Sequence, residues 1–429
     1  MRVQVPWSTG SVPVEIEETR VAGVLGANVE RAADPEGVLR QALEAPGAGL
    51  KAFLRGAASP LLVVVNDATR PTPSAEVLRV ICADLEEWLA GGGGAERELS
   101  LVVATGTHRV ALPQELEHIF GEEFLAAHAE RVSSHDAKDT SQLVHLGRTE
   151  QGTEIQVNRR LAEARSVMLI NSVEPHYFAG YTGGRKSLFP GLSGYQTVWA
   201  NHALSMKPGS ESLVLQGNPV HEDLEEALAV GIAGKQVFSI QLVLDKDHRV
   251  GFAAAGPLSD TFRRAVEVAD RQFVLDIDRR YEVVVAAAPH PMDCNFYQTN
   301  KAIQSGALAV KDGGVLIVVS ECPFCLGENQ TLYDMLAAAE SPAAALERAD
   351  QEEYVLGVQQ ATRIASILQR ADISAVTSLP EEQVRSMFMK PFGSVQEAVD
   401  AALACQGPEA KVLFLSEASI TVPRCGSWS

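Results

Sequence analysis

The sequence predicts an α/β protein of two domains with mostly parallel sheets. Apolar runs rich in Val, Ile and Leu recur along the chain, as expected for parallel strands buried on both faces. Amphipathic helical segments lie between several of these runs. At 429 residues, the chain also exceeds the size at which one hydrophobic core keeps growing. We therefore expect strands that alternate with helices in two successive units.

The expected strands share a continuous apolar composition bounded by polar or turn residues. They are Leu61–Asn66, Leu99–Ala104, Ser166–Asn171, Val237–Val243, Glu282–Ala287, Gly314–Ser320 and Lys411–Leu415. A helix is expected over Ser74–Ala90, where apolar residues recur at helical spacing. The glycines at positions 91–94 then predict a turn, because glycine costs stability inside either a helix or a strand.

A polar interruption over Asp276–Arg280 precedes a fresh strand and predicts a domain boundary there. We expect an N-terminal domain over residues 1–280 and a C-terminal domain over 281–410. The last segment, 411–429, could pair with strands of either domain, and one possibility is that it rejoins the N-terminal domain.

Composition narrows the class of partner. The net charge of -19 disfavours general binding to nucleic acid, which needs clustered Lys and Arg, and favours a small-molecule ligand. The first ten residues lack the pattern of a signal peptide, and no apolar run has the length of a membrane span, so we expect a cytoplasmic protein with no membrane partner. Cys322 and Cys325 form an isolated CxxC, for which a structural role is the simplest interpretation.

Polar residues that directly follow the first two strands are candidates for a site, because ligands of parallel sheets bind beyond the strands' carboxyl ends. Asp67, Thr69 and Arg70 follow the first strand, where helix-start N–H groups and a guanidinium could bind a phosphate or carboxylate. His108 follows the second and is an acid/base candidate, because imidazole titrates near neutrality. An N-cap Asp with a surface Arg, and a structural or exposed His, are the alternatives.

The segment after the third strand combines glycines with reactive side chains. Gly183 and Gly184 permit unusual dihedrals and close approach to a ligand. His176 and Lys186 are polar groups in an apolar setting, and a buried lysine could act as a nucleophile or bond to a cofactor. His202 could bind Ni, Zn or Cu through neutral imidazole, but one histidine is not a complete metal site.

A fourth cluster follows the strand at Glu282–Ala287. Tyr297, Gln298 and Lys301 would lie at the start of a helix, and the last two are three residues apart and could hold one carboxylate together. An ordinary solvated helix start is the alternative.

Taken together, these motifs resemble the nickel-dependent lactate racemase family. The shared motifs are Asp67-x-x-Arg70, Thr105-Gly-Thr-His108, Glu174-Pro-His176, Gly183-Gly-Arg-Lys186, Phe189-Pro-Gly191, His202 and Tyr297-Gln-x-x-Lys301. They cover most of the chain in the right order, and the block from His176 to His202 is the most specific.

The resemblance implies an active-site cleft between two α/β domains. The N-terminal domain would bind the cofactor and catalyse, and the C-terminal domain would contribute substrate contacts. It also implies a nickel pincer nucleotide, pyridinium-3,5-bisthiocarboxylic acid mononucleotide nickel, made by separate cofactor biosynthesis enzymes. Lys186 would carry this cofactor through one arm, and His202 would be the protein's nickel ligand.

The remaining roles follow from the same resemblance. The reaction would invert C2 of a 2-hydroxy acid by hydride transfer to and from the cofactor, so the chain would be an isomerase, either a racemase or an epimerase. His108 and His176 would be the acid/base pair. The expected cofactor contacts, besides the lysine, are Asp67, Thr69, Gly183 and Gly184, and the expected substrate contacts are Arg70, Tyr297, Gln298 and Lys301.

One departure from the family pattern bears on the substrate. Lactate-specific members carry a substrate-contacting Trp in the C-terminal domain, whereas the matching stretch here, Leu356-Gly-Val-Gln-Gln360, has none. We therefore expect a substrate other than lactate, and epimerisation of a sugar acid at C2 fits the same residues. A lyase that forms a Schiff base on Lys186 and a non-enzymatic nucleotide-binding protein remain alternatives.

Overall fold

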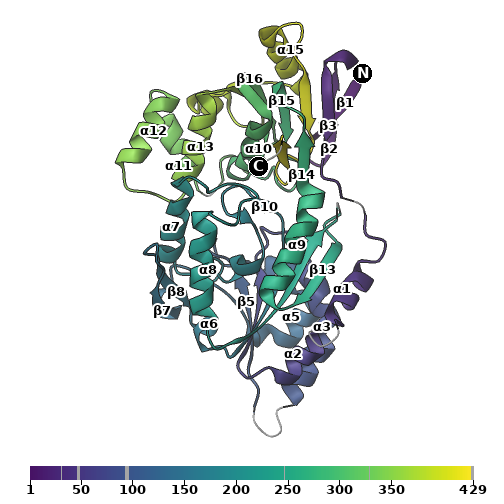
Figure 1. Ribbon diagram of the computed structural model, residues 1–429, viewed down its shortest axis with the longest axis vertical. Coiled ribbons are helices and arrows are strands. Elements are labelled where there is room, and N and C mark those ends of the chain that lie inside the picture. The colour runs from purple at the N-terminus through teal and green to yellow at the C-terminus, as the bar shows by residue number, and fades with distance from the viewer. Residues whose placement is uncertain (30, 46–48, 92–95, 246, 328, 427–429) are drawn as a thin grey trace. The chain divides into compact units, whose positions relative to one another are not determined.

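The computed structural model describes the chain except residues 30, 46–48, 92–95, 246, 328 and 427–429. It forms two compact units. The N-terminal unit is Val29–Arg271, and the C-terminal unit joins Met1–Asn28 to Gln272–Ser429. Each unit contains a large sheet with helices packed against it, which confirms the predicted α/β class (Figure 1).

A six-stranded sheet forms the centre of the N-terminal unit, in the order β13-β12-β9-β4-β5-β6. Its strands are β4 (Leu61–Asn66), β5 (Leu99–Ala104), β6 (Val132–Ser134), β9 (Ser166–Ser172), β12 (Gln236–Leu244) and β13 (Val250–Gly256). All neighbours pair in parallel except β13, which runs antiparallel to β12. The carboxyl ends of β4, β5, β9 and β12 therefore lie at one edge of the sheet.

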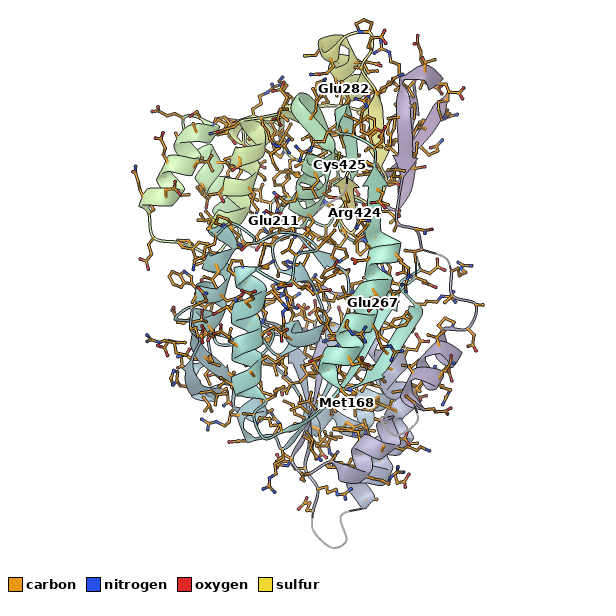
Figure 2. All side chains as sticks on the ribbon, in the orientation of Figure 1. Met168, Glu211, Glu267, Glu282, Arg424 and Cys425 are labelled. Atoms are coloured by element: carbon orange, nitrogen blue, oxygen red, sulfur yellow. The ribbon has the colours of Figure 1, made fainter. Side chains whose placement is uncertain are left out.

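Both faces of this sheet are covered, which explains the continuous apolar strands. Leu61, Val63 and Val65 of β4 pack towards the helices α1 (Pro35–Leu43), α2 (Leu50–Gly56), α3 (Ser74–Ala90), α4 (Pro113–Phe120) and α5 (Glu122–His128). The alternate residues of β4 pack on the other face against α6 (Arg159–Glu163) and α8 (Pro219–Gly231). Met168 of β9, labelled in Figure 2, is fully buried in the first of these two layers.

The C-terminal unit has a second six-stranded sheet, entirely parallel, in the order β18-β17-β16-β15-β19-β3. Its strands are β3 (Val21–Leu25), β15 (Tyr281–Ala287), β16 (Val310–Val319), β17 (Asp372–Val376), β18 (Lys390–Phe392) and β19 (Val412–Leu415). One face packs against α10 (Phe296–Ala309), α11 (Thr331–Ala337), α12 (Pro342–Gln351), α13 (Val358–Leu368) and α14 (Glu381–Ser386). The other face packs against α15 (Val395–Gln406) and the hairpin of β1 (Arg2–Trp7) and β2 (Gly10–Glu15).

The division between the units differs from the predicted boundary. Segment 1–28 belongs to the C-terminal unit, because β3 pairs with β19. The last segment stays there too, since β19 pairs with β15 and β20 (Val422–Cys425) pairs with β14 (Val274–Ile277). Arg424, labelled in Figure 2, strengthens the second pairing through its bond to Asp276 at 2.7 Å. These pairings join residues far apart in sequence, which local patterns do not reveal.

The expected local elements are present. Each of the seven predicted strands coincides with or lies largely within a strand of the structure, and α3 spans the residues predicted for it. Gly91 caps α3, while the rest of the glycine tract, 92–94, lies outside the described residues. No helix in the described part of the chain is long and apolar enough to cross a membrane.

Candidate active site

The densest group of predicted residues follows β9, at the carboxyl edge of the N-terminal sheet. A short hairpin of β10 (Pro175–His176) and β11 (Gly180–Tyr181) carries His176. A single 3₁₀ turn, η4 (Gly184–Ser187), carries Lys186, and helix α7 (Tyr195–Ala203) carries His202.

Three strands of the sheet hold η4 in place. Asn66 at the end of β4 accepts a hydrogen bond from the Ser187 hydroxyl at 2.9 Å. Asn171 of β9 donates to the same hydroxyl oxygen at 2.8 Å. Gln241 of β12 accepts from the first N–H of η4 at 3.0 Å. The turn that carries Lys186 is therefore anchored to the sheet by amide side chains, which the sequence analysis did not single out. Asn66 and Asn171 could have been found as polar residues at the ends of apolar strands, whereas Gln241 lies inside β12.

The two glycines before Lys186 have a structural reason of their own. Gly183 and Gly184 have φ of 70° and 54°, in the left-handed region. A Cβ on Gly183 would lie 2.5 Å from Val173, and one on Gly184 would lie 2.7 Å from the Phe262 ring. Both glycines thus let η4 pack tightly on its own unit, and their predicted contact with a cofactor stays a prediction.

The ring of Phe178 lies at the centre of three predicted residues. Its centroid is 4.5 Å from that of His176 and 5.2 Å from that of His202, and both pairs meet edge to face. The Lys186 ammonium lies over the same ring, 5.6 Å from its centroid. The structure therefore brings these three predicted residues together around an aromatic residue that the sequence analysis passed over.

His202 is held in its neutral form. Burial is the main cause that lowers its pKa to about 3; the Lys186 charge and the charge His108 carries when protonated act in the same direction, and the Val198 backbone opposes them. Its Nδ1 is buried and, among the described residues, has no hydrogen-bond partner of good geometry. A neutral imidazole with an unused buried nitrogen is the form in which histidine binds a metal.

His176 is 8 % exposed, and its hydrogen bonds fix its tautomer. Its Nδ1 accepts from the backbone N–H of Ala179 at 3.3 Å and, more weakly, from that of Phe178 at 3.5 Å. Because Nδ1 is the acceptor, the neutral ring carries its hydrogen on Nε2. His176 can therefore donate a hydrogen bond from Nε2.

His108 has the opposite tautomer. Its Nδ1 lies 2.7 Å from Oδ2 of Asp67, and an ionised carboxylate only accepts, so Nδ1 carries the hydrogen and Nε2 is the free acceptor. The other carboxylate oxygen of Asp67 accepts from the Thr69 hydroxyl at 2.8 Å. His108 is 45 % exposed, so its reactive nitrogen is open to a ligand.

Backbone bonds connect the loop of His108 to the turn of Lys186. The N–H of Gly106 donates to the carbonyl of Gly191 at 2.9 Å, and the N–H of Gly191 donates to the carbonyl of Lys186 at 3.0 Å. His108 and Lys186 are therefore held on linked segments, consistent with the electrostatic effect of both on His202.

Arg70 lies beside the hairpin of His176. Its Nη1 is 3.4 Å from Oε1 of Glu174, two residues before that histidine, and both side chains are largely buried. This long contact leaves the guanidinium with further N–H groups, so the geometry is compatible with a ligand carboxylate as well.

Next to Lys186 lies a buried cation, Arg185, to which the sequence analysis assigned no role. It is 1 % exposed, donates to the Ala179 carbonyl at 2.9 Å, and lies 3.7 Å from Glu225. Its guanidinium also stacks over Phe262, 5.5 Å from the ring centroid. Burial lowers its pKa to about 10. Arg185 therefore anchors the loop of Lys186 from the side of α8.

The remaining predicted residues belong to the C-terminal unit. Tyr297, Gln298 and Lys301 lie in the first turns of α10 and are half-buried. Asn295 caps this helix by accepting from the Gln298 N–H at 2.9 Å. Gln298 and Lys301 are three residues apart and so share one helix face, as predicted.

The CxxC pair lies in the same unit. Cys322 and Cys325 are free thiols, the first buried and the second exposed. The Cys322 sulfur lies 3.4 Å from the Thr299 hydroxyl. These contacts are those of ordinary packing, in keeping with the structural role expected for the pair.

Two family models match the chain. The lactate racemase N-terminal domain matches residues 7–212, and the lactate racemase C-terminal domain matches residues 278–422. The lactate racemase of Thermoanaerobacterium thermosaccharolyticum is 25% identical over 432 residues, covering 98% of this chain and 99% of the relative. The lactate racemase of Lactiplantibacillus plantarum is 26% identical over 427 residues, covering 97% and 98% respectively.

Solved structures agree with these matches. The lactate racemase apoprotein from Thermoanaerobacterium thermosaccharolyticum superposes with a TM-score of 0.89 at 25% identity, covering 99% of this chain and all of that one. A protein from Thermotoga maritima shares the fold, with a TM-score of 0.67 at 17% identity over 92% of this chain and all of its own. Since the two family models together span most of the residues, the chain belongs to the lactate racemase family, a family of isomerases.

Proposed function

We propose that this isomerase inverts C2 of a 2-hydroxy acid with a nickel pincer nucleotide held by Lys186 and His202. One observation carries the proposal: a neutral imidazole with an unpartnered buried nitrogen shares the Phe178 ring with a lysine amine. The relatives named lactate racemase support racemisation of a 2-hydroxy acid as the class of reaction.

The residues present fit this cofactor. In the part of the chain that the structure describes, no group of three His, Cys, Asp or Glu donors surrounds His202, so the chain offers a metal one nitrogen there. That matches a nickel ion that arrives with its other donors, while the Lys186 amine can bond to the cofactor's acyl arm. When bound, the cofactor supplies those nickel donors and an electron-poor ring that accepts hydride from C2 of the substrate.

We propose that His108 moves the hydroxyl proton. Its Nε2 is the free acceptor, so it can take the proton as the C2 hydrogen departs, and it returns the proton when the hydroxyl reforms. Asp67 acts as a positioning residue, because it fixes the tautomer and stabilises the imidazolium. Both oxygens of Asp67 are used by His108 and Thr69, and a carboxylate repels phosphate. We therefore propose that Asp67 positions His108 and that Thr69 holds Asp67, in place of the cofactor contact expected for both residues.

We propose that His176 contributes less to proton transfer than His108 does. Its neutral ring already carries a hydrogen on Nε2, so it can hold the substrate oxygen by donation. Taking up a proton would require Nδ1 to give up its backbone N–H donors, which costs free energy. We therefore keep both histidines as catalytic residues and propose that His108 exchanges the proton more readily than His176.

This inequality is testable by substitution. His176→Gln keeps an N–H donor and should retain part of the activity, whereas His108→Gln has no group that takes up a proton and should lose nearly all of it. Equal losses in kcat for the two variants, at unchanged nickel content, would contradict the proposed difference.

The substrate is proposed to be a 2-hydroxy acid other than lactate, because the stretch Leu356–Gln360 lacks the indole expected of a lactate-specific member. Arg70, Tyr297, Gln298 and Lys301 are the predicted carboxylate contacts, and Gln298→Ala and Lys301→Ala should raise KM more than they lower kcat. A sugar acid that is epimerised at C2 fits the same residues.

The test begins with the chain produced alongside the cofactor biosynthesis enzymes. Nickel content by elemental analysis should be about one per chain and should be lost in His202→Ala, while the exposed His118→Ala serves as the matched control. A chirality screen of 2-hydroxy acids, lactate included, then identifies the substrate. Full nickel and activity in His202→Ala would refute the assignment, and borohydride trapping of a carbonyl substrate on Lys186 would favour the lyase instead.

A further inference from the structure

A second cluster of metal-binding side chains lies on the outer helices of the N-terminal unit. Cys82 and Glu86 are one turn apart on α3, and His128 ends α5, which packs against α3 (Figure 1). One donor atom from each residue lies within 4.8 Å of the others. Among the described residues this is the one group of three or more such donors that lie so close together.

His128 is the unusual member of the cluster. It is 1 % exposed, and neither ring nitrogen has a hydrogen-bond partner of good geometry in the described part of the chain. Its Nε2 lies 3.1 Å from Oε1 of Glu86, but at an angle that does not make a hydrogen bond. The ring is held by tilted packing on Phe124, with centroids 4.4 Å apart. A buried imidazole is thus directed at a carboxylate without the bond that would explain its burial.

The chemistry of the three donors selects a class of ion. A thiolate, an imidazole and a carboxylate are the usual ligands of zinc, bound at about 2.0–2.3 Å, which places donors of a tetrahedral site roughly 3.5 Å apart. The observed spacing needs small rotations of the side chains of Cys82 and Glu86. Glu86 is 53 % exposed, so water can fill the fourth position from that side.

The protonation states are suited to binding. Burial lowers the pKa of His128, which favours the neutral imidazole. Burial and the Glu86 charge raise the pKa of the Cys82 thiol, so the thiol proton must pass to solvent as the metal–sulfur bond forms.

We propose that Cys82, Glu86 and His128 bind one zinc-class divalent cation, with water as the fourth ligand, and that this ion fastens α5 to α3. The proposal is independent of the racemase function, because none of the three residues takes part in it. The ion would replace an unsatisfied buried polar contact with a bonded one and would stabilise the native unit by linkage.

The test uses the full chain produced without the cofactor and stripped with a chelator. Titration calorimetry with zinc should show one equivalent bound, and cobalt, as a coloured substitute, should show a thiolate-to-metal charge-transfer band. Zinc at 100 times its Kd should raise the Tm by about 5 to 10 °C. Cys82→Ser should remove the band and weaken binding at least tenfold.

Controls separate this site from others. Glu86→Gln is at an exposed position and should fold, yet it should also weaken zinc binding at least tenfold. Cys405→Ser changes an exposed cysteine on α15 and should leave stoichiometry, band and Tm shift unchanged, as should His202→Ala. Absence of zinc binding, or binding and a cobalt band that survive both Cys82→Ser and Glu86→Gln, would overturn the proposal.

Discussion

Replacing Asp67 with Asn tests how the carboxylate serves His108. Asp67→Asn keeps the size of the side chain and removes its negative charge. The amide still can accept from Nδ1 through its oxygen, but it can equally present its N–H group and favour the wrong tautomer of His108. Either way, the imidazolium formed when His108 takes the substrate proton loses its ionic partner, which lies at 2.7 Å.

The size of the effect follows from the geometry. A hydrogen bond to a charged group contributes about 1.5–3 kcal/mol. His108 is 45 % exposed, so solvent screens part of this interaction and the lower figure applies. A loss of about 1.5 kcal/mol of transition-state stabilisation corresponds to a decrease of about tenfold in kcat, with KM nearly unchanged because Asp67 does not face the substrate's carboxylate in this scheme.

The assay is the initial rate of inversion of the 2-hydroxy acid substrate, followed by chiral chromatography, on enzyme with measured nickel content. Asp67→Glu should recover part of the rate, because it restores the charge. Asp312→Asn, which removes a carboxylate from a surface ion pair with Arg370, is the matched control and should leave the rate unchanged. A full wild-type kcat in Asp67→Asn, or a rate lost together with the nickel, would refute the positioning role and favour a cofactor contact.

Three further predictions concern the framework around Lys186. Arg185→Ala should lower the free energy of unfolding by about 3 kcal/mol, since it empties the space of a fully buried side chain and leaves the Ala179 carbonyl without its hydrogen bond. Arg185→Lys should recover part of this loss in denaturant titrations. Gly191→Ala should cost about 1–3 kcal/mol, because its Cβ would overlap the Ser187 carbonyl oxygen; a wild-type Tm would contradict this. Burial and the Arg185 charge lower the pKa of His221 to about 3, so on acidification the unfolded chain takes up this proton before the folded chain does. The free energy of unfolding therefore falls as the pH drops below about 6.5. His221→Gln should reduce this slope by up to about 1.4 kcal/mol per pH unit, which measurements of Tm against pH would detect.

The arrangement around Phe178 explains how His202, the proposed metal ligand, and a cationic lysine can lie close together. His202 stays neutral beside Lys186, so two positive charges are not forced together. The aromatic face stabilises the ammonium without taking up its proton. An apolar ring thus orders polar residues from three different elements.

Local patterns in the sequence were enough to predict the strands, helix α3 and the candidate site residues at strand ends. Buried parallel strands need continuous apolar runs, and a ligand edge needs polar residues directly after them, so both leave a signal within a few residues. The family motifs then assigned chemistry to His108, His176, Lys186 and His202, and the fold and family that they implied are confirmed.

Only the tertiary structure decided which partners those residues have. The pairing of β3 with β19 places the first residues of the chain in the C-terminal unit, and the clamp of Asn66, Asn171 and Gln241 on the turn of Lys186 joins three strands. The tautomers of His108 and His176 likewise depend on Asp67 and on backbone N–H groups that fold next to them. Such contacts arise from packing between segments that are distant in the sequence. The energy of each contact depends on distance and burial, which the order of the residues alone does not specify.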